Sequence, residues 1–254
     1  MDEKRIIDSW SSQNVVNYYI SHRDNADELY PSEKRYLEET LKPGKNILDI
    51  GCAAGGFSKI VKSYNKTIDY AGIDISPVMI DKAKKRFPDD KFYVFNDQRI
   101  DFADNLFDVV ICFGVLHMTE AWEKLFAEAW RVCNGTMLCD LRIVEGEGVC
   151  DSTKSYQKLE FSDKWDGIAK APYVVTNIDE VLKLLVGLTP RISTLKAYGY
   201  WHSVSSMTVS NYKEVCMSVF SIRKKGNHDM KVAEWESPVR PKLDRFANII
   251  KVEG

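Results

Sequence analysis

The 254-residue chain lacks several features that would place it quickly in a class of protein. None of its six cysteines forms a Cys-x-x-Cys pair, so neither a zinc site nor a disulfide framework is expected. No apolar run reaches the length of a membrane span, and the N-terminal Met-Asp-Glu-Lys-Arg leads into no apolar signal core. We therefore expect a cytoplasmic protein with buried free thiols, no bound metal and no membrane contact.

The sequence also lacks an excess of charge of either sign. Its formal net charge is -2 and 28% of its residues are charged, which is typical of a globular protein. It has no basic patch, which disfavours a nucleic-acid partner, and no internal repeat or low-complexity segment. The length suits one large domain, or one domain with an elaboration, and leaves both a monomer and a homodimer open.

One stretch, from Asn46 to Ser58, organises the rest of the chain. The apolar residues 47–50 predict a buried strand, and the small residues after them predict a tight turn. A helix is expected next, because an apolar stripe at helical spacing follows: Phe57, Ile60, Val61 and Tyr64. Gly51 can adopt a positive φ, and Gly55 and Gly56 allow the backbone to approach a ligand closely. A strand, a glycine turn and a helix N-terminus together predict a nucleotide-binding site.

Two cofactor families use such a turn, and Asp49 helps to separate them. Gly51, Ala53 and Gly56 fit the dinucleotide pattern G-x-G-x-x-G only loosely. The run Asp49-x-Gly51-x-Ala53-x-Gly55 instead resembles the first motif of the class I S-adenosylmethionine-dependent methyltransferases, with Ala53 in place of the middle glycine. An acid at this strand end would repel a pyrophosphate, whereas it suits the ammonium of a methionine moiety. A tight turn without any ligand is the third interpretation.

A second acid, Asp74, ends the next predicted strand, residues 70–75. Ser76-Pro77 then predicts the start of a helix that carries Met79 on its apolar face. A carboxylate at this place can accept hydrogen bonds from both hydroxyls of a ribose, a device that both cofactor families use. The alternative for Asp74 is a simple turn or cap residue.

Residues 107–113 are nearly all apolar, as expected for a parallel strand that is buried on both faces. The stretch from Asp101 into this strand is very similar to the methyltransferase pattern F-x-D-x-x-F-D-x-V. His117 follows the strand and is a candidate general base, with a structural or positioning role as the alternative. Further along, Asp140 is expected to pair with the nearby Arg142.

From residue 46 to about 223, four motifs in this order resemble a class I S-adenosylmethionine-dependent methyltransferase. The resemblance implies an α/β fold, a Rossmann-like three-layer sandwich with a seven-stranded, mostly parallel sheet whose last strand is antiparallel. Residues 1–45 are expected to form a helical cover, residues 145–176 a lid or insertion, and residues 224–254 a C-terminal tail.

The resemblance also implies the cofactor and its contacts. S-adenosyl-L-methionine would be the methyl donor and S-adenosyl-L-homocysteine the product, and no metal is implied. Asp97 would bind the adenine amino group and Gln98 would flank the ring, with His117 as the catalytic candidate. The implied cofactor-binding residues are Asp49, Gly51, Ala53, Gly55, Asp74, Ile75, Met79, Asp97, Gln98, Phe113 and Tyr19.

We expect an enzyme that transfers the methyl group in line to an oxygen or nitrogen of a small molecule, such as a sugar, a nucleotide sugar or a secondary metabolite. The segment Phe113 to Leu116 differs from the Asn/Asp-Pro-Pro-Tyr/Phe motif of enzymes that methylate nucleic-acid amino groups. Two alternatives stay open. One is a nicotinamide-dependent reductase, although the single Tyr-x-x-x-Lys, residues 30–34, lies upstream of the glycine turn. The other is a non-catalytic protein that binds S-adenosylmethionine.

Overall fold

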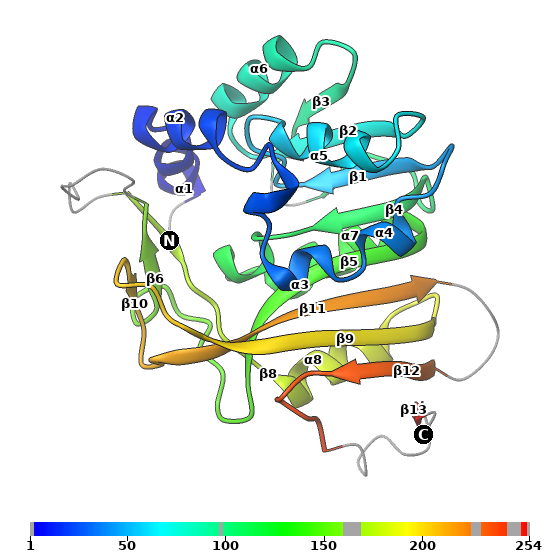
Figure 1. Cartoon of the computed structure of the whole chain (residues 1–254). Coiled ribbons are helices and arrows are strands. Elements are labelled where there is room, and N and C mark those ends of the chain that lie inside the picture. Colours follow the sequence, from blue (N-terminus) through cyan, green and yellow to red (C-terminus); the bar gives the residue numbers. More distant parts are fainter. Residues whose placement is uncertain (1–2, 97–98, 160–168, 225–229, 243–249, 253–254) are drawn as a thin grey trace.

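The computed structural model describes residues 3–96, 99–159, 169–224, 230–242 and 250–252. Figure 1 shows a large twisted sheet with helices on both faces and a small second sheet near the N-terminal helices. The large sheet has the strand order β13-β12-β9-β11-β5-β4-β1-β2-β3, and β8 pairs with β5. The strand bounds are β1 (Asn46–Ile50), β2 (Asp69–Asp74), β3 (Lys91–Val94), β4 (Phe107–Cys112), β5 (Cys133–Val144), β8 (Thr176–Asn177), β9 (Ile192–Ser203), β11 (Glu214–Lys224), β12 (Met230–Glu236) and β13 (Ile250–Val252).

The central part of the large sheet has the predicted topology. β1 is parallel to β2 and β4, β3 is parallel to β2, and β5 is parallel to β4. β11 runs antiparallel to both β5 and β9. The predicted seven-stranded, mostly parallel sheet with an antiparallel last strand is therefore confirmed in β3-β2-β1-β4-β5-β11-β9.

The sheet continues past these seven strands. β12 pairs parallel to β9, and β13 pairs parallel to β12, so the segment expected to be a tail adds strands to the sheet. In β12, Val232 is buried, and the carboxylates of Glu234 and Glu236 accept hydrogen bonds from Arg35 at 2.8 and 2.9 Å. A strand held by a buried valine and by ion pairs carries little apolar periodicity, which explains why the sequence pattern does not reveal it.

Helices cover both faces of the sheet and bury two main apolar cores. One core is shared with α7 and α8, and its aromatic side chains include Trp122, Phe126 and Trp130. The other core lies against the opposite face, where α4, α5 and α6 contribute Leu37, Phe57 and Ile80. These layers form the expected three-layer sandwich. The helix bounds are α5 (Gly56–Tyr64), α6 (Pro77–Arg86), α7 (Trp122–Val132) and α8 (Ile178–Gly187).

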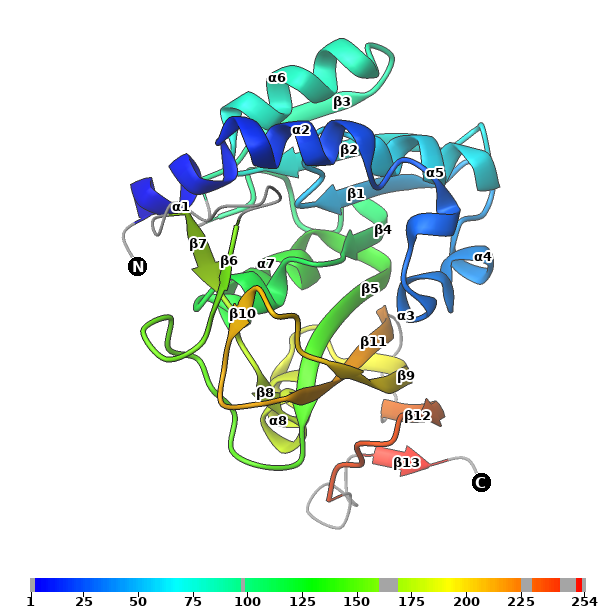
Figure 2. The same cartoon turned by 60° about the vertical axis from the view of Figure 1, so that its left-hand side comes forward.

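The N-terminal residues fold into short helices, of which α1 and α2 lie over the carboxyl ends of β1 and β2 (Figures 1 and 2), while α3 contacts β9 and β11. Arg86 of α6 fixes this cover to the sheet, because its guanidinium donates to the carbonyl oxygens of Ala54 at 2.7 Å and Ile20 at 2.9 Å. The end of α2 is thereby joined to the glycine turn. These helices are α1 (Glu3–Trp10), α2 (Gln13–Ser21), η1 (Ala26–Glu28), α3 (Pro31–Lys34) and α4 (Leu37–Thr40).

A small antiparallel sheet closes the same region from another side. It consists of β6 (Tyr156–Lys158), β7 (Lys170–Pro172) and β10 (Thr208–Val209), in the order β10-β6-β7. Leu159 and Ala171 of this region pack in one apolar cluster with Val15 and Val16 of α2. Strands of two or three residues are too short to show an alternating pattern, so the sequence predicts an insertion here without its strands.

The last strand of the central sheet ends on a buried lysine, which provides a test of the packing. The ammonium of Lys224 donates to the carbonyl oxygens of Trp130 at 2.7 Å and Cys133 at 2.8 Å. Lys224→Met would leave both buried carbonyls without this donor, so we expect the free energy of unfolding to fall by about 1–3 kcal/mol. Lys183→Met on the exposed side of α8 should change it by less than about 0.5 kcal/mol. Urea unfolding measures both, and equal effects would contradict the assigned role.

Candidate functional site

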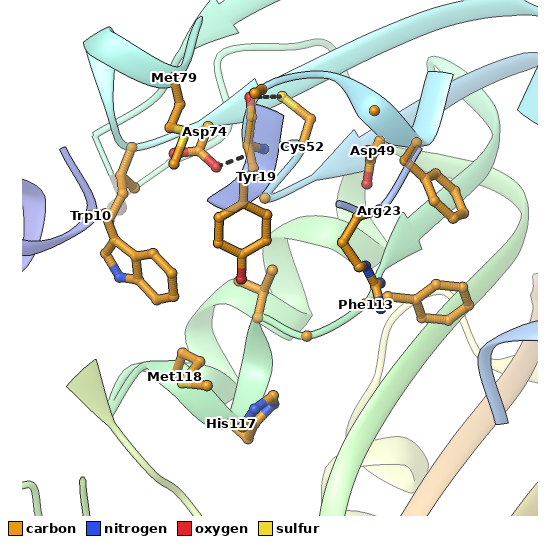
Figure 3. Close-up of a pocket in the computed structure, with 18 of the residues that line it drawn as sticks. Trp10, Tyr19, Arg23, Asp49, Cys52, Asp74, Met79, Phe113, His117 and Met118 are labelled. Atoms are coloured by element: carbon orange, nitrogen blue, oxygen red, sulfur yellow. Dashed lines mark hydrogen bonds between the residues drawn. The ribbon is translucent and has the colours of Figure 1, made fainter. Parts of the chain in front are cut away.

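A cavity of about 280 Å³ lies at the carboxyl ends of β1, β2 and β4. The glycine turn lines one side of it, the N-terminal helices cover it, and residues of β5 and β6 reach it from the small-sheet side. Ligands of open α/β sheets bind at this edge, outside the carboxyl ends of the strands. Figure 3 shows Asp49 and Asp74 along one side of the cavity and His117 and Met118 along the other, with the Tyr19 ring between them.

The backbone of the glycine turn is held against β2. Gly51, at a φ of 79°, and Cys52 donate their backbone N–H groups to the carbonyl of Ile73 at 2.8 and 3.0 Å. Ala53, which stands in place of the middle glycine, adopts a φ of 45°, and its N–H donates to Oδ2 of Asp74 at 3.0 Å. The hydrogen bond to Asp74 therefore holds an alanine in a backbone region that favours glycine.

The other two glycines of the turn have different roles. Gly56 lines the cavity, and a Cβ at this position would lie 2.6 Å from the carbonyl oxygen of Arg23. Gly55 is missing from the described residues that line the cavity, and its Cβ would lie 3.0 Å from the rings of Phe87 and Phe92. Gly55 thus lets the residues after α6 and in β3 pack closely behind the turn, and its expected contact with the cofactor stays a prediction.

Asp49 ends β1 as a buried acid that faces the cavity, with 5% of its surface exposed. Its Oδ2 accepts a hydrogen bond from the hydroxyl of Tyr70 at 2.5 Å. Burial raises the pKa of Asp49 to about 7, although the Tyr70 hydrogen bond and the charge of Arg23 oppose the increase. A cation placed beside Asp49 would therefore stabilise its ionised form strongly.

Asp74 caps the turn after β2, as one of the two interpretations of the sequence expects, and it also lines the cavity. Its Oδ1 accepts the N–H of Ser76 at 2.9 Å and its Oδ2 accepts the N–H of Ala53, so it caps the turn after β2. It also lines the cavity, and each carboxylate oxygen has a second lone pair that a ligand hydroxyl can use. Burial raises the pKa of Asp74 to about 6, and the backbone hydrogen bonds limit the rise.

The remaining predicted cofactor residues fall into two groups. Tyr19, Ile75, Met79 and Phe113 line the same cavity as Asp49, together with Gly51 and Ala53. Asp97 and Gln98 lie outside the described residues, so their predicted contacts with adenine stay predictions.

Arg23 is a cavity residue that the sequence pattern does not reveal. It follows α2 at a φ of 66°, and its two terminal nitrogens donate to the carboxylate of Glu33 at 2.9 and 2.7 Å. Burial disfavours its charge, but Glu33 outweighs this effect and holds the pKa of Arg23 above its usual value. Figure 3 places Arg23 beside Asp49 and Phe113. A single arginine after a helix belongs to no motif, so only the fold brings it to the site.

His117 lies in the short helix η2 (Leu116–Met118) and is 3% exposed. It lines the cavity, and its Nδ1 has no hydrogen-bond partner among the described residues. Burial lowers the pKa of His117 to about 3, and the positive charge of Arg142 acts in the same direction. A general base works best with a pKa near the working pH. The neutral ring therefore suits the positioning role better than the base role.

The predicted pair of Asp140 and Arg142 is confirmed on β5. Nη1 of Arg142 donates to Oδ2 of Asp140 at 2.6 Å, while Oδ1 of Asp140 accepts the N–H of Gly114 at 2.6 Å. Asp140 is almost fully buried, and Arg142 lines the cavity. The pair thus joins the turn after β4 to β5 and sets the position of a buried guanidinium at the cavity wall.

Fold and cavity together define a Rossmann-like α/β protein with a cavity at the carboxyl ends of its parallel strands, lined by Asp49 and Asp74. Among the described residues, no three metal-ligating side chains gather in one place. The helices in the described part of the chain are also too short or too polar to cross a membrane.

Comparison with known proteins agrees with this class. Residues 48–137 match the family described as methyltransferase domain. The chain is 31% identical over 124 residues to 2-methyl-6-phytyl-1,4-hydroquinone methyltransferase of Synechocystis sp., which covers 41% of this chain and 38% of that protein. It is 28% identical over 180 residues to a ubiquinone/menaquinone biosynthesis C-methyltransferase of Rickettsia prowazekii, covering 66% and 62%. It is 30% identical over 109 residues to probable tRNA methyltransferase 9B of Homo sapiens, covering 41% and 22%.

The fold is also similar to that of a solved S-adenosylmethionine-dependent methyltransferase from Methanosarcina mazei. The TM-score is 0.55 at 18% identity, over 77% of this chain and 98% of that chain. Each of the three curated relatives above is matched over less than two thirds of its own length. Residues 48–137 therefore match a methyltransferase domain, and the fold around them is that of a solved S-adenosylmethionine-dependent methyltransferase.

Gly51 offers a test of the turn that shapes the site. A Cβ added at its φ of 79° would be strained and would collide with a methyl group of Val115. We expect Gly51→Ala to lower the free energy of unfolding by about 1–3 kcal/mol. Gly187→Ala in α8 is the control, because its Cβ would meet nothing within 4 Å and should be neutral or slightly stabilising. Thermal unfolding compares the two, and a wild-type midpoint for Gly51→Ala would refute the assignment.

Proposed function

We propose that the chain binds S-adenosylmethionine in this cavity and transfers its methyl group in line to an oxygen or nitrogen of a small molecule. The observation that carries the proposal is the placement of Asp49 and Asp74. They end neighbouring parallel strands and face one cavity, with the glycine turn between them. Arg23 adds the opposite charge at the same cavity.

The residues present fit the separate parts of the donor. The methionine ammonium would lie beside Asp49 and its carboxylate beside Arg23, so a zwitterion would meet two opposite charges. The ribose hydroxyls would donate to Asp74. Ile75 and Met79 offer apolar surface for the adenine ring.

The chain itself would contribute mainly alignment and shielding. The cofactor supplies an electrophilic methyl group on a sulfonium, so the nucleophile needs a fixed in-line position above all. Tyr19 of α2 and Leu159 after β6 line the cavity from its two covers, where they would exclude water. His117 and Arg142 line the remaining side, which we assign to the methyl acceptor.

The covers favour a small acceptor. The N-terminal helices and the small sheet lie over the strand ends from two sides (Figure 2), and a net charge of -2 offers little attraction to a polyphosphate. A tRNA nucleoside is the second candidate, which the name of the human relative favours. Formation of S-adenosylhomocysteine with small-molecule or tRNA acceptors, followed by mass spectrometry, distinguishes the two and also separates both from a non-catalytic binder.

Removal of the charge on Asp74 tests the cofactor site. Asp74→Asn keeps the shape but offers a single acceptor oxygen, so we expect the affinity for S-adenosylhomocysteine to fall about 10- to 100-fold. Asp81→Asn on the exposed side of α6 should leave the affinity unchanged. Isothermal titration calorimetry measures both variants. The proposal fails if the wild-type protein does not bind, or if Asp74→Asn binds as tightly as the control.

The pKa of Asp49, raised to about 7, predicts a pH dependence of binding. Below pH 7 Asp49 is mostly protonated, and an ammonium ligand must displace that proton, so the affinity should fall as the pH is lowered. We expect S-adenosylhomocysteine to bind about tenfold more weakly at pH 6 than at pH 8. Asp49→Asn has no such proton and should bind weakly with a flat profile. A titration series across this range checks the slope, and a flat wild-type profile would contradict it.

A further inference from the structure

Two buried polar groups on the acceptor side of the cavity have unused hydrogen-bonding capacity. His117 is 3% exposed, and its Nδ1 has no partner among the described residues. Arg142 is 7% exposed; it donates to Asp140 and is also hydrogen-bonded to Tyr173. A guanidinium carries five N–H groups, so further donors remain at the cavity wall. Buried polar groups in native proteins are normally satisfied, which points to a ligand as the missing partner.

The charged groups on this side are already paired with each other. Asp140 accepts from Arg142 and from the Gly114 N–H at 2.6 Å each. A second ionised group would enter a buried site without a free counter-charge, which is unfavourable. A neutral polar group needs hydrogen bonds only.

A hydroxyl is the neutral group that satisfies both partners. Its oxygen can accept an N–H of Arg142, and its hydrogen can be donated to a lone pair of the neutral His117 ring. The two residues are neighbours, because both line the cavity and both contact Tyr173, which is hydrogen-bonded to Arg142 and has its ring centroid 5.7 Å from that of His117. A carboxylate could use Arg142 but has no hydrogen for the imidazole, and an ammonium could use His117 but would be repelled by Arg142.

Aromatic side chains also line the cavity. Tyr19, Tyr30 and Phe113 line the cavity, and Tyr173 contacts the His117 ring edge-to-face at a centroid distance of 5.7 Å. Aromatic rings of a ligand gain from such edge-to-face neighbours beyond the area that they bury. The walls therefore suit a flat ring that carries the hydroxyl.

We propose that His117 and Arg142 form the acceptor-recognition pair of this site and select an uncharged, hydroxylated ring, with the hydroxyl held between the imidazole and the guanidinium. The inference rests on the proposed function in assigning this side to the acceptor. His117 acts here as a binding residue that orients the acceptor, and the hydroxyl that it holds is an anchor.

Three probes of similar outline test the pair on the full-length protein saturated with S-adenosylhomocysteine. Hydroquinone carries two hydroxyls, 1,4-difluorobenzene carries none, and terephthalate carries two carboxylates. Ligand-observed NMR titration should show hydroquinone binding about tenfold more tightly than either of the others, the difference expected for one or two buried hydrogen bonds. The same titrations are repeated without S-adenosylhomocysteine, so that the probes test the pair even if the protein does not bind the cofactor. Failure to bind S-adenosylhomocysteine would count against the proposed function but not against the preference for hydroquinone.

Two variants assign the preference to His117. His117→Leu keeps the volume and should remove most of the preference for hydroquinone, whereas His117→Asn retains a hydrogen-bonding side chain and should keep much of it. Both should bind S-adenosylhomocysteine within about twofold of the wild type, with unfolding midpoints that confirm a folded protein. The inference is wrong if terephthalate binds best, if hydroquinone and difluorobenzene bind alike, or if His117→Leu retains the full preference.

Discussion

The site depends on the hydrogen bonds that hold the glycine turn against the end of β2. Gly51 and Cys52 share the carbonyl of Ile73, and Ala53 donates to Asp74. One carboxylate therefore fixes the backbone next to it and also faces the cavity. These hydrogen bonds hold the backbone of the turn close to the cavity. Without them, the alanine at position 53 would move away from its unfavourable positive φ. The position of Asp49 at the adjoining strand end follows from the same sheet register.

The covers of the cavity show how segments far apart in sequence complete the site. Arg86 joins the end of α2 to the glycine turn, and the small sheet meets α2 through an apolar cluster. Arg23 then lies over Gly56, where a side chain could not fit. A rigid sheet thus supplies the acids, and less regular segments supply the closure, the usual division between scaffold and loops.

The sequence predicts those parts whose pattern is local and strong. β1, the glycine turn and α5 could be predicted because a buried strand, a turn and an amphipathic helix each have a clear local pattern. Asp74 follows from a strand end, and the pairing of Asp140 follows from an acid within a strand that also carries Arg142. The small sheet, β12 and the role of Arg23 could not be predicted. The small sheet consists of strands of two or three residues, and β12 pairs with a strand that is distant in the sequence. Arg23 is a single side chain whose position at the cavity depends on the whole fold.

Electrostatic asymmetry connects the two sides of the cavity. On the acceptor side, Arg142 is balanced by Asp140. On the other side, Asp49 and Asp74 accept hydrogen bonds from neutral donors, and burial raises the pKa of both, although the charge of Arg23 partly opposes the rise at Asp49. A cationic ligand is therefore drawn to the glycine turn while an uncharged one suits the opposite wall. If the donor is S-adenosylmethionine, loss of the methyl group also removes the sulfonium charge, and the buried acids then hold the product less tightly than the substrate.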